Sequence, residues 1–149
     1  YGSNMDLEQM RYRCPNSKVV STSCIEDYRL QFNQHATIVK DKGAKTPVVL
    51  WEIAPQDWKS LDRYEGYPSY YRKELMNVKV GGRERASLVY IMNTPDFAIS
   101  PPALTYLEGI KRGCKQHGID TEYLDKAYAD SIQRVKQLRT RCKHSPKSR

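Results

Sequence analysis

Alternating apolar and polar positions predict a strand-rich region in the first two thirds of the chain. The alternation is clearest over Leu75–Val80 and at Tyr28, Leu30 and Phe32, where the apolar residues share one face. The Gly81-Gly82 pair is typical of a hairpin turn. With the other short apolar runs, these patterns predict five strands, at 25–32, 36–40, 47–53, 70–80 and 86–92.

Helical periodicity predicts one helix before the strands and two after them. The first covers 6–13, with Asn4 or Ser3 as its N-cap and a proline shortly beyond its end. The later two cover about 100–117 and 120–139, and the second begins with a capping aspartate. Strands followed by helices, joined by antiparallel hairpins, indicate an α+β domain whose mostly antiparallel sheet curls into a small β-barrel with flanking helices.

A further short helix is predicted between the strands. Pro55 occupies its first turn and Gly66 the position just beyond its end. Trp58, Leu61 and Glu65 lie at i, i+3 and i+7, so they share one face. The carboxylate of Glu65 is therefore expected to point toward the interior.

The net charge of +8 is concentrated at the C-terminal end. Of the 25 basic residues, seven lie in 134–149, which contains no acid, and the other 18 balance 17 acidic residues in 1–133. A nearly neutral body with a basic tail does not have the charge distribution of a nucleic-acid-binding fold. The sequence thus predicts one domain over 1–133 and a basic extension over 134–149 that frays or is disordered.

The cysteines and histidines do not form a metal-binding pattern. The four cysteines show no CxxC spacing, and the three histidines do not cluster with them. Free and mostly buried thiols in a reducing cytoplasm are expected. No apolar run reaches the length of a membrane span, and no secretory signal is found.

Known catalytic motifs are missing, which directs attention to "LDRYEGYPSYYR" at 61–72. The chain has no GxSxG elbow, P-loop or dinucleotide fingerprint. Glu65 lies on an apolar helical face and at a helix C-terminus, and both positions disfavour its charged form. A raised pKa suits a general acid or base that works near neutral pH. The alternative is a partly exposed glutamate that pairs with Arg63 or Arg72.

Tyrosines accompany this glutamate, and a small-residue segment opens the chain. Two interpretations are open for Tyr64, Tyr67, Tyr70, Tyr71 and Tyr106. Each tyrosine either offers its hydroxyl to a ligand or is a core residue whose hydroxyl reaches solvent. "YGSNM" at 1–5 is either a helix-capping turn or a backbone cradle for a ligand.

Three ordered segments together resemble one family. "YGSNM", "LDRYEGYPSYYR" and "PPALTYLEGIKRGCKQHGIDTEYL" resemble the gamma-glutamylcyclotransferase-like superfamily (gamma-glutamyl cyclotransferase / AIG2-like), and "RCP" at 13–15 and "VVLWEI" at 48–53 add to the match. The resemblance spans residue 1 to about 127. It implies a mixed α/β fold built around a small β-barrel, with a further strand ahead of Tyr1.

The resemblance also implies a site. Glu65 would be the catalytic acid/base. The substrate-binding residues would be Tyr1, Gly2, Ser3, Asn4, Met5, Tyr71 and Tyr106. The implied activity releases 5-oxoproline, together with an amine or amino acid, from a γ-glutamyl amide, with no cofactor or metal.

The resemblance leaves the substrate and the assembly open. One alternative is a cyclotransferase for γ-glutamylamines or a γ-glutamylated biosynthetic intermediate, and another is a non-catalytic binding or interaction module on the same fold. The expected partner is a small-molecule γ-glutamyl substrate in the cytoplasm, without nucleic acid or membrane. A homodimer is one possible assembly.

Overall fold

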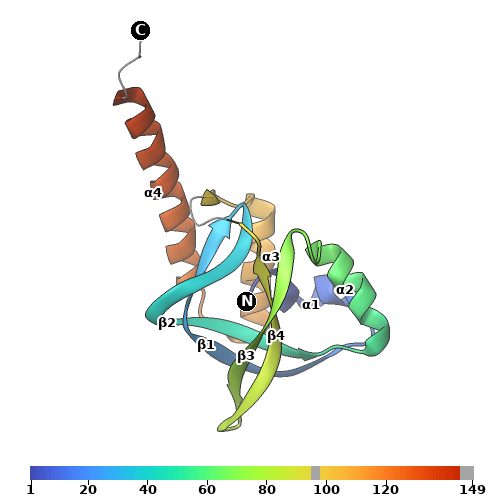
Figure 1. Cartoon of the computed structure of the whole chain (residues 1–149). Helices are drawn as coiled ribbons and strands as arrows, with labels where there is room; N and C mark the ends of the chain where they lie inside the picture. Colours follow the sequence, from blue (N-terminus) through green and yellow to red (C-terminus); the bar gives the residue numbers. More distant parts are fainter. Residues whose placement is uncertain (95–97, 145–149) are drawn as a thin grey trace.

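The computed structural model describes residues 1–94 and 98–144, and the strands there number four rather than five (Figure 1). They are β1 (Lys18–Asn33), β2 (His35–Glu52), β3 (Tyr71–Val80) and β4 (Arg83–Met92). The strands predicted at 36–40 and 47–53 are one continuous strand, β2. The prediction was wrong there because the gap between them is an irregularity in the β1–β2 pairing.

A register shift in β1 and β2 accommodates this irregularity. Tyr28 pairs with Lys40, whereas Glu26 pairs with Lys45, so the intervening residues of β2 bulge opposite Asp27. The N–H of Gly43 donates to the Asp27 carboxylate at 2.9 Å and ties the bulge to β1. The strand therefore continues through a polar stretch that shows no alternation.

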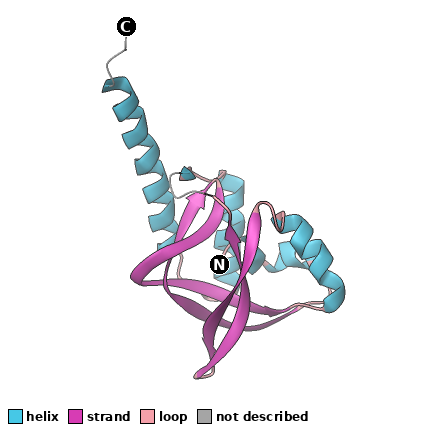
Figure 2. Cartoon of the chain, in the orientation of Figure 1, coloured by secondary structure: helices cyan, strands magenta, loops and turns pink. Residues whose placement is uncertain are grey.

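The four strands form two antiparallel pairs, β1–β2 and β3–β4. The Gly81-Gly82 turn joins β3 to β4, which confirms the predicted hairpin. Figure 2 shows the two pairs curving around a common interior with the helices outside them. The α+β class is thus observed, while no closed barrel is found among the described residues and that expectation stays unconfirmed.

Helices flank the strands on both sides. A 3₁₀ turn, η1 (Ser3–Met5), leads into α1 (Leu7–Arg13), and η2 (Pro55–Asp57) leads into α2 (Trp58–Glu65). α3 (Leu104–Gln116) and α4 (Glu122–His144) follow the strands. No helix in the described ranges is both long and apolar enough to cross a membrane.

Three helix boundaries differ from the prediction. α3 begins at Leu104 and not near 100, because Ser100 instead pairs with Asn33 in an isolated β-bridge. Asp6, not Asn4 or Ser3, is the N-cap of α1, because its carboxylate accepts the N–H of Glu8 at 3.1 Å. α4 continues without a break to His144, beyond the predicted end near 139. It projects away from the body of the molecule (Figure 1). Residues 145–149 of the predicted extension lie outside the described residues, and the division at 133/134 stays a prediction.

The core lies between the strands and the last two helices. Phe32 of β1, Ile110 of α3 and Leu124 of α4 are fully buried, and Met5 joins the same cluster. All four cysteines are free, as expected. Two of them, Cys24 and Cys142, are exposed, so the prediction of mostly buried thiols was wrong for half of the set.

Candidate active site

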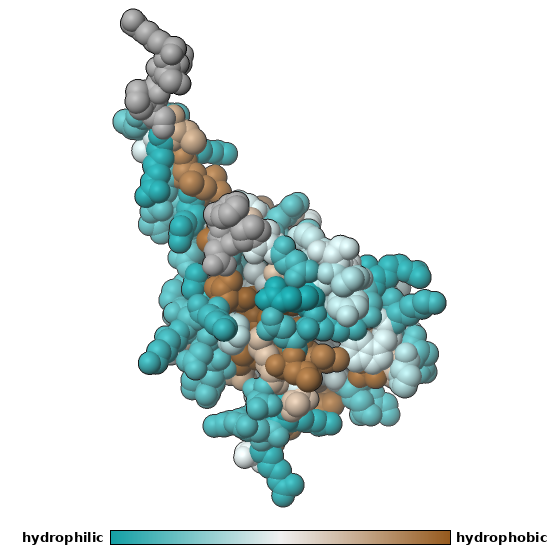
Figure 3. All heavy atoms as spheres, viewed as in Figure 1, coloured by the Kyte–Doolittle hydropathy of each residue, from teal (hydrophilic) through white to brown (hydrophobic). Residues whose placement is uncertain are grey.

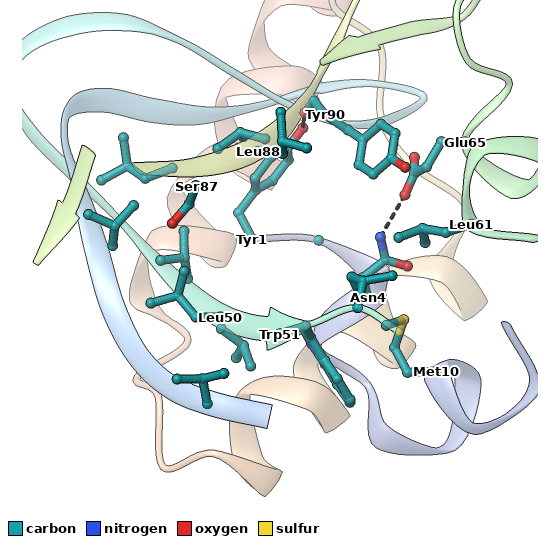
Figure 4. A pocket seen from close by; sticks show the side chains of 18 of the residues that line it. Tyr1, Asn4, Met10, Leu50, Trp51, Leu61, Glu65, Ser87, Leu88 and Tyr90 are labelled. Atoms are coloured by element: carbon teal, nitrogen blue, oxygen red, sulfur yellow. Dashed lines mark hydrogen bonds between the residues drawn. The ribbon is translucent and has the colours of Figure 1, made fainter. Parts of the chain in front are cut away.

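A cavity of about 380 Å³ is bordered by strands of both sheets and by the first residues of the chain (Figure 4). Its volume falls in the range of about 300–1,000 Å³ that is usual for small-molecule sites. The N-terminal loop and α2 contribute polar groups at one end, and β2 and β4 contribute mostly apolar side chains at the other.

Close packing holds the N-terminal loop in place. The η1 turn is closed by a hydrogen bond of 3.0 Å from the Met5 N–H to the Gly2 carbonyl. A Cβ on Gly113 of α3 would lie 2.8 Å from the Asp6 nitrogen and the Met5 carbonyl carbon, so only glycine permits this approach. A Cβ on Gly2 would lie 3.3 Å from the Ala36 Cβ. The loop therefore sits directly between α3 and β2.

Asp6 ties the same loop to α1 and α3. Its side chain is fully buried and accepts hydrogen bonds from Gln9 at 2.9 Å and from Arg112 at 2.6 Å. Burial opposes ionisation of Asp6, yet these donors and the Glu8 N–H together hold its pKa below the usual value of 3.8. The carboxylate of Asp6 is therefore ionised, and its hydrogen bonds link the loop to α1 and α3.

Glu65, at the end of α2, lies beside the loop at the same end of the cavity. Gly66 ends the helix, as predicted from its place just beyond the last turn, and it has the left-handed conformation. The Glu65 side chain is 9% exposed, and its Oε1 accepts a hydrogen bond of 2.6 Å from Nδ2 of Asn4. Asn4 and Glu65 point toward each other in Figure 4.

The environment of Glu65 raises its pKa. Burial is the dominant cause, because it disfavours the carboxylate. The Asn4 hydrogen bond and the charge of Arg13 act in the opposite direction without cancelling it. The alternative pairing with Arg63 or Arg72 is not observed, since Asn4 bonds Glu65 and Arg72 pairs with Glu74 at 2.7 Å.

Arg13 supports this pair from α1. Its guanidinium donates to the Asn4 side-chain oxygen at 2.8 Å and to the Ser3 hydroxyl at 3.2 Å. It also bonds Gln9 and lies 3.4 Å from the centre of the Tyr64 ring. Because the side-chain oxygen of Asn4 accepts a hydrogen bond from Arg13, the amide is oriented with its NH₂ group toward Glu65.

α2 is fixed to the β3–β4 pair by a second group of polar contacts. Asp62 forms a salt bridge of 2.7 Å with Lys73 and accepts a hydrogen bond from the Tyr90 hydroxyl. The Lys73 ammonium also lies over the ring of Trp58, 4.7 Å from its centre. These contacts set the position of the helix from which Glu65 projects.

Two predicted tyrosines line the cavity and share one backbone partner. The hydroxyl of Tyr71 donates to the Ala36 carbonyl at 2.6 Å, and that of Tyr106 accepts the Ala36 N–H at 3.0 Å. Burial raises the pKa of each hydroxyl, so both are neutral. Tyr64, Tyr67 and Tyr70 are more than two-fifths exposed and lie outside the cavity lining.

The structure brings most of the predicted site residues together. The residues that line this same cavity are Tyr1, Gly2, Ser3, Asn4, Glu65, Tyr71 and Tyr106. Met5 is not among its lining residues, because its side chain packs in the core. It contributes a backbone carbonyl instead, 2.9 Å from Nε2 of His117.

Sequence reasoning missed Arg13 and the apolar wall. Gln9 and Arg13 stand four residues apart, so they share a helical face, and that spacing was the available signal for the arginine. Trp51 lines the cavity, and its buried indole N–H has no partner among the described residues. The strand that contains Trp51 has the same alternating pattern as an ordinary core strand, so the sequence does not mark it as a cavity wall. The described residues also contain no group of three or more His, Cys, Asp or Glu side chains arranged to hold a metal ion.

The fold and the motif order agree with one family model. The model for "Gamma-glutamyl cyclotransferase, AIG2-like" matches residues 1–108, which is more than half of the chain. The chain therefore belongs to this family.

Named relatives support the assignment at modest identity. The chain is 27% identical over 143 residues to gamma-glutamylcyclotransferase from Homo sapiens, covering 87% of this chain and 75% of that protein. It is 28% identical over 140 residues to the Bos taurus protein of the same name, with 85% and 73% covered. A solved structure named gamma-glutamyl cyclotransferase superposes with a TM-score of 0.73 at 26% identity, covering 85% of this chain and 82% of that one.

Proposed function

We propose that the protein releases 5-oxoproline and an amine or amino acid from a γ-glutamyl amide, with Glu65 as general acid/base. The observation that carries this proposal is a buried glutamate, hydrogen-bonded at 2.6 Å to the Asn4 amide, in the same cavity as the N-terminal loop. Membership of the cyclotransferase family supports the reaction type.

The reaction needs no nucleophile from the protein. The substrate's α-amine attacks its own γ-carbonyl carbon, a new C–N bond closes the five-membered lactam, and the original amide C–N bond breaks. The α-nitrogen must lose a proton and the leaving nitrogen must gain one. A single carboxylate of raised pKa serves both steps, accepting the proton first and then returning it.

The N-terminal loop supplies the binding half of the proposed site. The first N–H groups of a helical turn have no acceptor within that turn. We assign those of Gly2, Ser3 and Asn4 to the substrate's α-carboxylate or to the developing oxyanion. The close contact between Gly2 and Ala36 supports this assignment, because a side chain at position 2 would push the loop away from the cavity wall.

The remaining lining residues shape the pocket for the γ-glutamyl group. Tyr1 closes one side, where its hydroxyl donates to the Tyr90 carbonyl. Tyr71 and Tyr106 hold the backbone of Ala36 and present their rings to the cavity. In this proposal the tyrosines define the shape of the pocket while Glu65 carries out the proton transfers.

The test is incubation with γ-glutamyl amino acids and γ-glutamylamines, with detection of 5-oxoproline. Formation of 5-oxoproline from any of them is the expected result. A fully folded protein that binds these compounds without forming 5-oxoproline would instead support the non-catalytic binding module. Turnover of the amines alone would favour the γ-glutamylamine alternative.

A further inference from the structure

The cavity extends well beyond the space around Glu65. Asn4 and Glu65 lie at one end in Figure 4, and Leu50, Ser87 and Leu88 lie at the other. A volume of about 380 Å³ is enough for a complete small-molecule ligand and not only for its reacting group. The far end is therefore available to the part of the substrate that leaves.

The side chains of this far end are mostly apolar. β2 contributes Val48 to Trp51, and β4 contributes Ala86, Leu88 and Val89 beside the hydroxyl of Ser87. The ionisable residues that line this part are Glu52 and Arg85, and both are exposed. A charged group carried into the interior would find no buried partner among these residues, and burying an unpaired charge is costly.

The cavity opens beside an exposed pair of leucines. Leu75 of β3 and Leu88 of β4 are direct cross-strand partners, and residues paired in this way lie on the same face of the hairpin. Leu75 is 72% exposed and Leu88 is 48% exposed, yet both line the cavity. Figure 3 shows hydrophobic atoms gathered over this hairpin. The mouth therefore offers an apolar surface that a ligand would remove from water.

We propose that the far end is a leaving-group subsite for an apolar amine or apolar amino acid, so that the protein selects γ-glutamyl amides with such groups. This inference rests on the proposed cyclotransferase activity. A branched alkyl chain attached to the γ-glutamyl nitrogen would lie along β2 and contact Leu88. Burial of apolar area is the driving force.

Four substrates test the preference and distinguish an apolar amine from an apolar amino acid as the leaving group. γ-Glutamyl-leucine and γ-glutamyl-isopentylamine share the alkyl chain and differ in the carboxylate, while γ-glutamyl-alanine and γ-glutamyl-aspartate are the small and the charged comparisons. We expect kcat/KM for both alkyl substrates to exceed that for the alanine compound by at least about tenfold, since a few methylene groups in an apolar pocket give that discrimination. The aspartate compound should be the poorest substrate. A higher value for the amine than for leucine would identify the amine as the preferred class.

Matched variants locate the preference. Leu88→Asp should remove most of the leucine-over-alanine ratio. Leu138→Asp, on α4, makes the same change at a residue of similar exposure, 50%, outside the cavity, and should leave the ratio unchanged. Because both residues are substantially exposed, both variants should fold, which far-ultraviolet circular dichroism can check.

The outcomes distinguish the two levels of the proposal. If none of the four substrates gives 5-oxoproline, the proposed release of 5-oxoproline from γ-glutamyl amino acids and simple γ-glutamylamines is wrong, and the subsite is refuted with it. If the alanine compound is turned over as well as the alkyl compounds, or if Leu88→Asp keeps the wild-type ratio, the activity stands and the apolar subsite is refuted.

Discussion

Replacement of Glu65 by glutamine is the most direct test of the mechanism. The Gln side chain retains an oxygen that can accept the 2.6 Å hydrogen bond from Asn4, so the local geometry should survive. It cannot take up a proton from the α-nitrogen. General acid–base groups contribute roughly 10²–10⁴-fold to rate, which is about 2.7–5.4 kcal/mol of activation free energy.

The same substitution should affect stability in a defined direction. Burial raises the pKa of Glu65 in the folded state above the ordinary value of 4.5. A group with a raised folded-state pKa loses its stabilising contribution as pH rises through that pKa, because ionisation then occurs in a buried position. Glu65→Gln avoids this loss. The melting temperature of the variant relative to wild type should therefore increase between pH 4 and pH 7.

The assay is 5-oxoproline formation at several pH values, with thermal melts of the same samples. Glu108→Gln on the exposed face of α3 is the matched control, and it should change neither quantity. Undiminished kcat/KM in Glu65→Gln would refute the acid/base role. Lost activity together with a strongly reduced melting temperature at pH 7 would contradict the argument that burial of the ionised group is unfavourable.

Three further predictions concern the residues around Glu65. Asn4→Ala removes a hydrogen bond that lowers the pKa of Glu65, so the acidic limb of the kcat/KM profile should move to higher pH, and an unchanged limb would contradict this coupling. Gly2→Val should weaken substrate binding, seen as a raised Kd in calorimetry, because its side chain crowds the Ala36 Cβ. Gly113→Ala should destabilise the fold by about 1–3 kcal/mol in denaturant titrations, since its Cβ would lie 2.8 Å from backbone atoms, while the exposed Lys115→Ala serves as control.

Local chemistry in the sequence was sufficient for much of the fold. Pro55 and Gly66 marked the limits of the helical segment that contains α2, and the spacing of Leu61 and Glu65 correctly placed both on its buried face. The Gly81-Gly82 turn was equally clear, because hairpin turns depend on the conformational preferences of a few neighbouring residues. Signals of this kind act over a single turn, so a linear pattern contains them.

The sequence did not predict features that depend on distant partners. The continuity of β2 depends on a bulge opposite Asp27, and the N-cap of α1 is an aspartate that also accepts a hydrogen bond from Arg112 on α3. Met5 was expected in the pocket by its place in "YGSNM". Its side chain instead fills the core, because α3 approaches that part of the loop closely at Gly113.

The sequence by itself determined the residue types of the site, and the tertiary structure decided how they meet. A glutamate on an apolar helical face already implied a raised pKa, since burial and helix position follow from periodicity. Its hydrogen bond to Asn4 joins residues 61 positions apart, and the support from Arg13 and the apolar end of the cavity come from other elements again. These contacts required the packing of α1, α2 and both strand pairs, because a distance between remote segments is set by the whole fold and not by local preference.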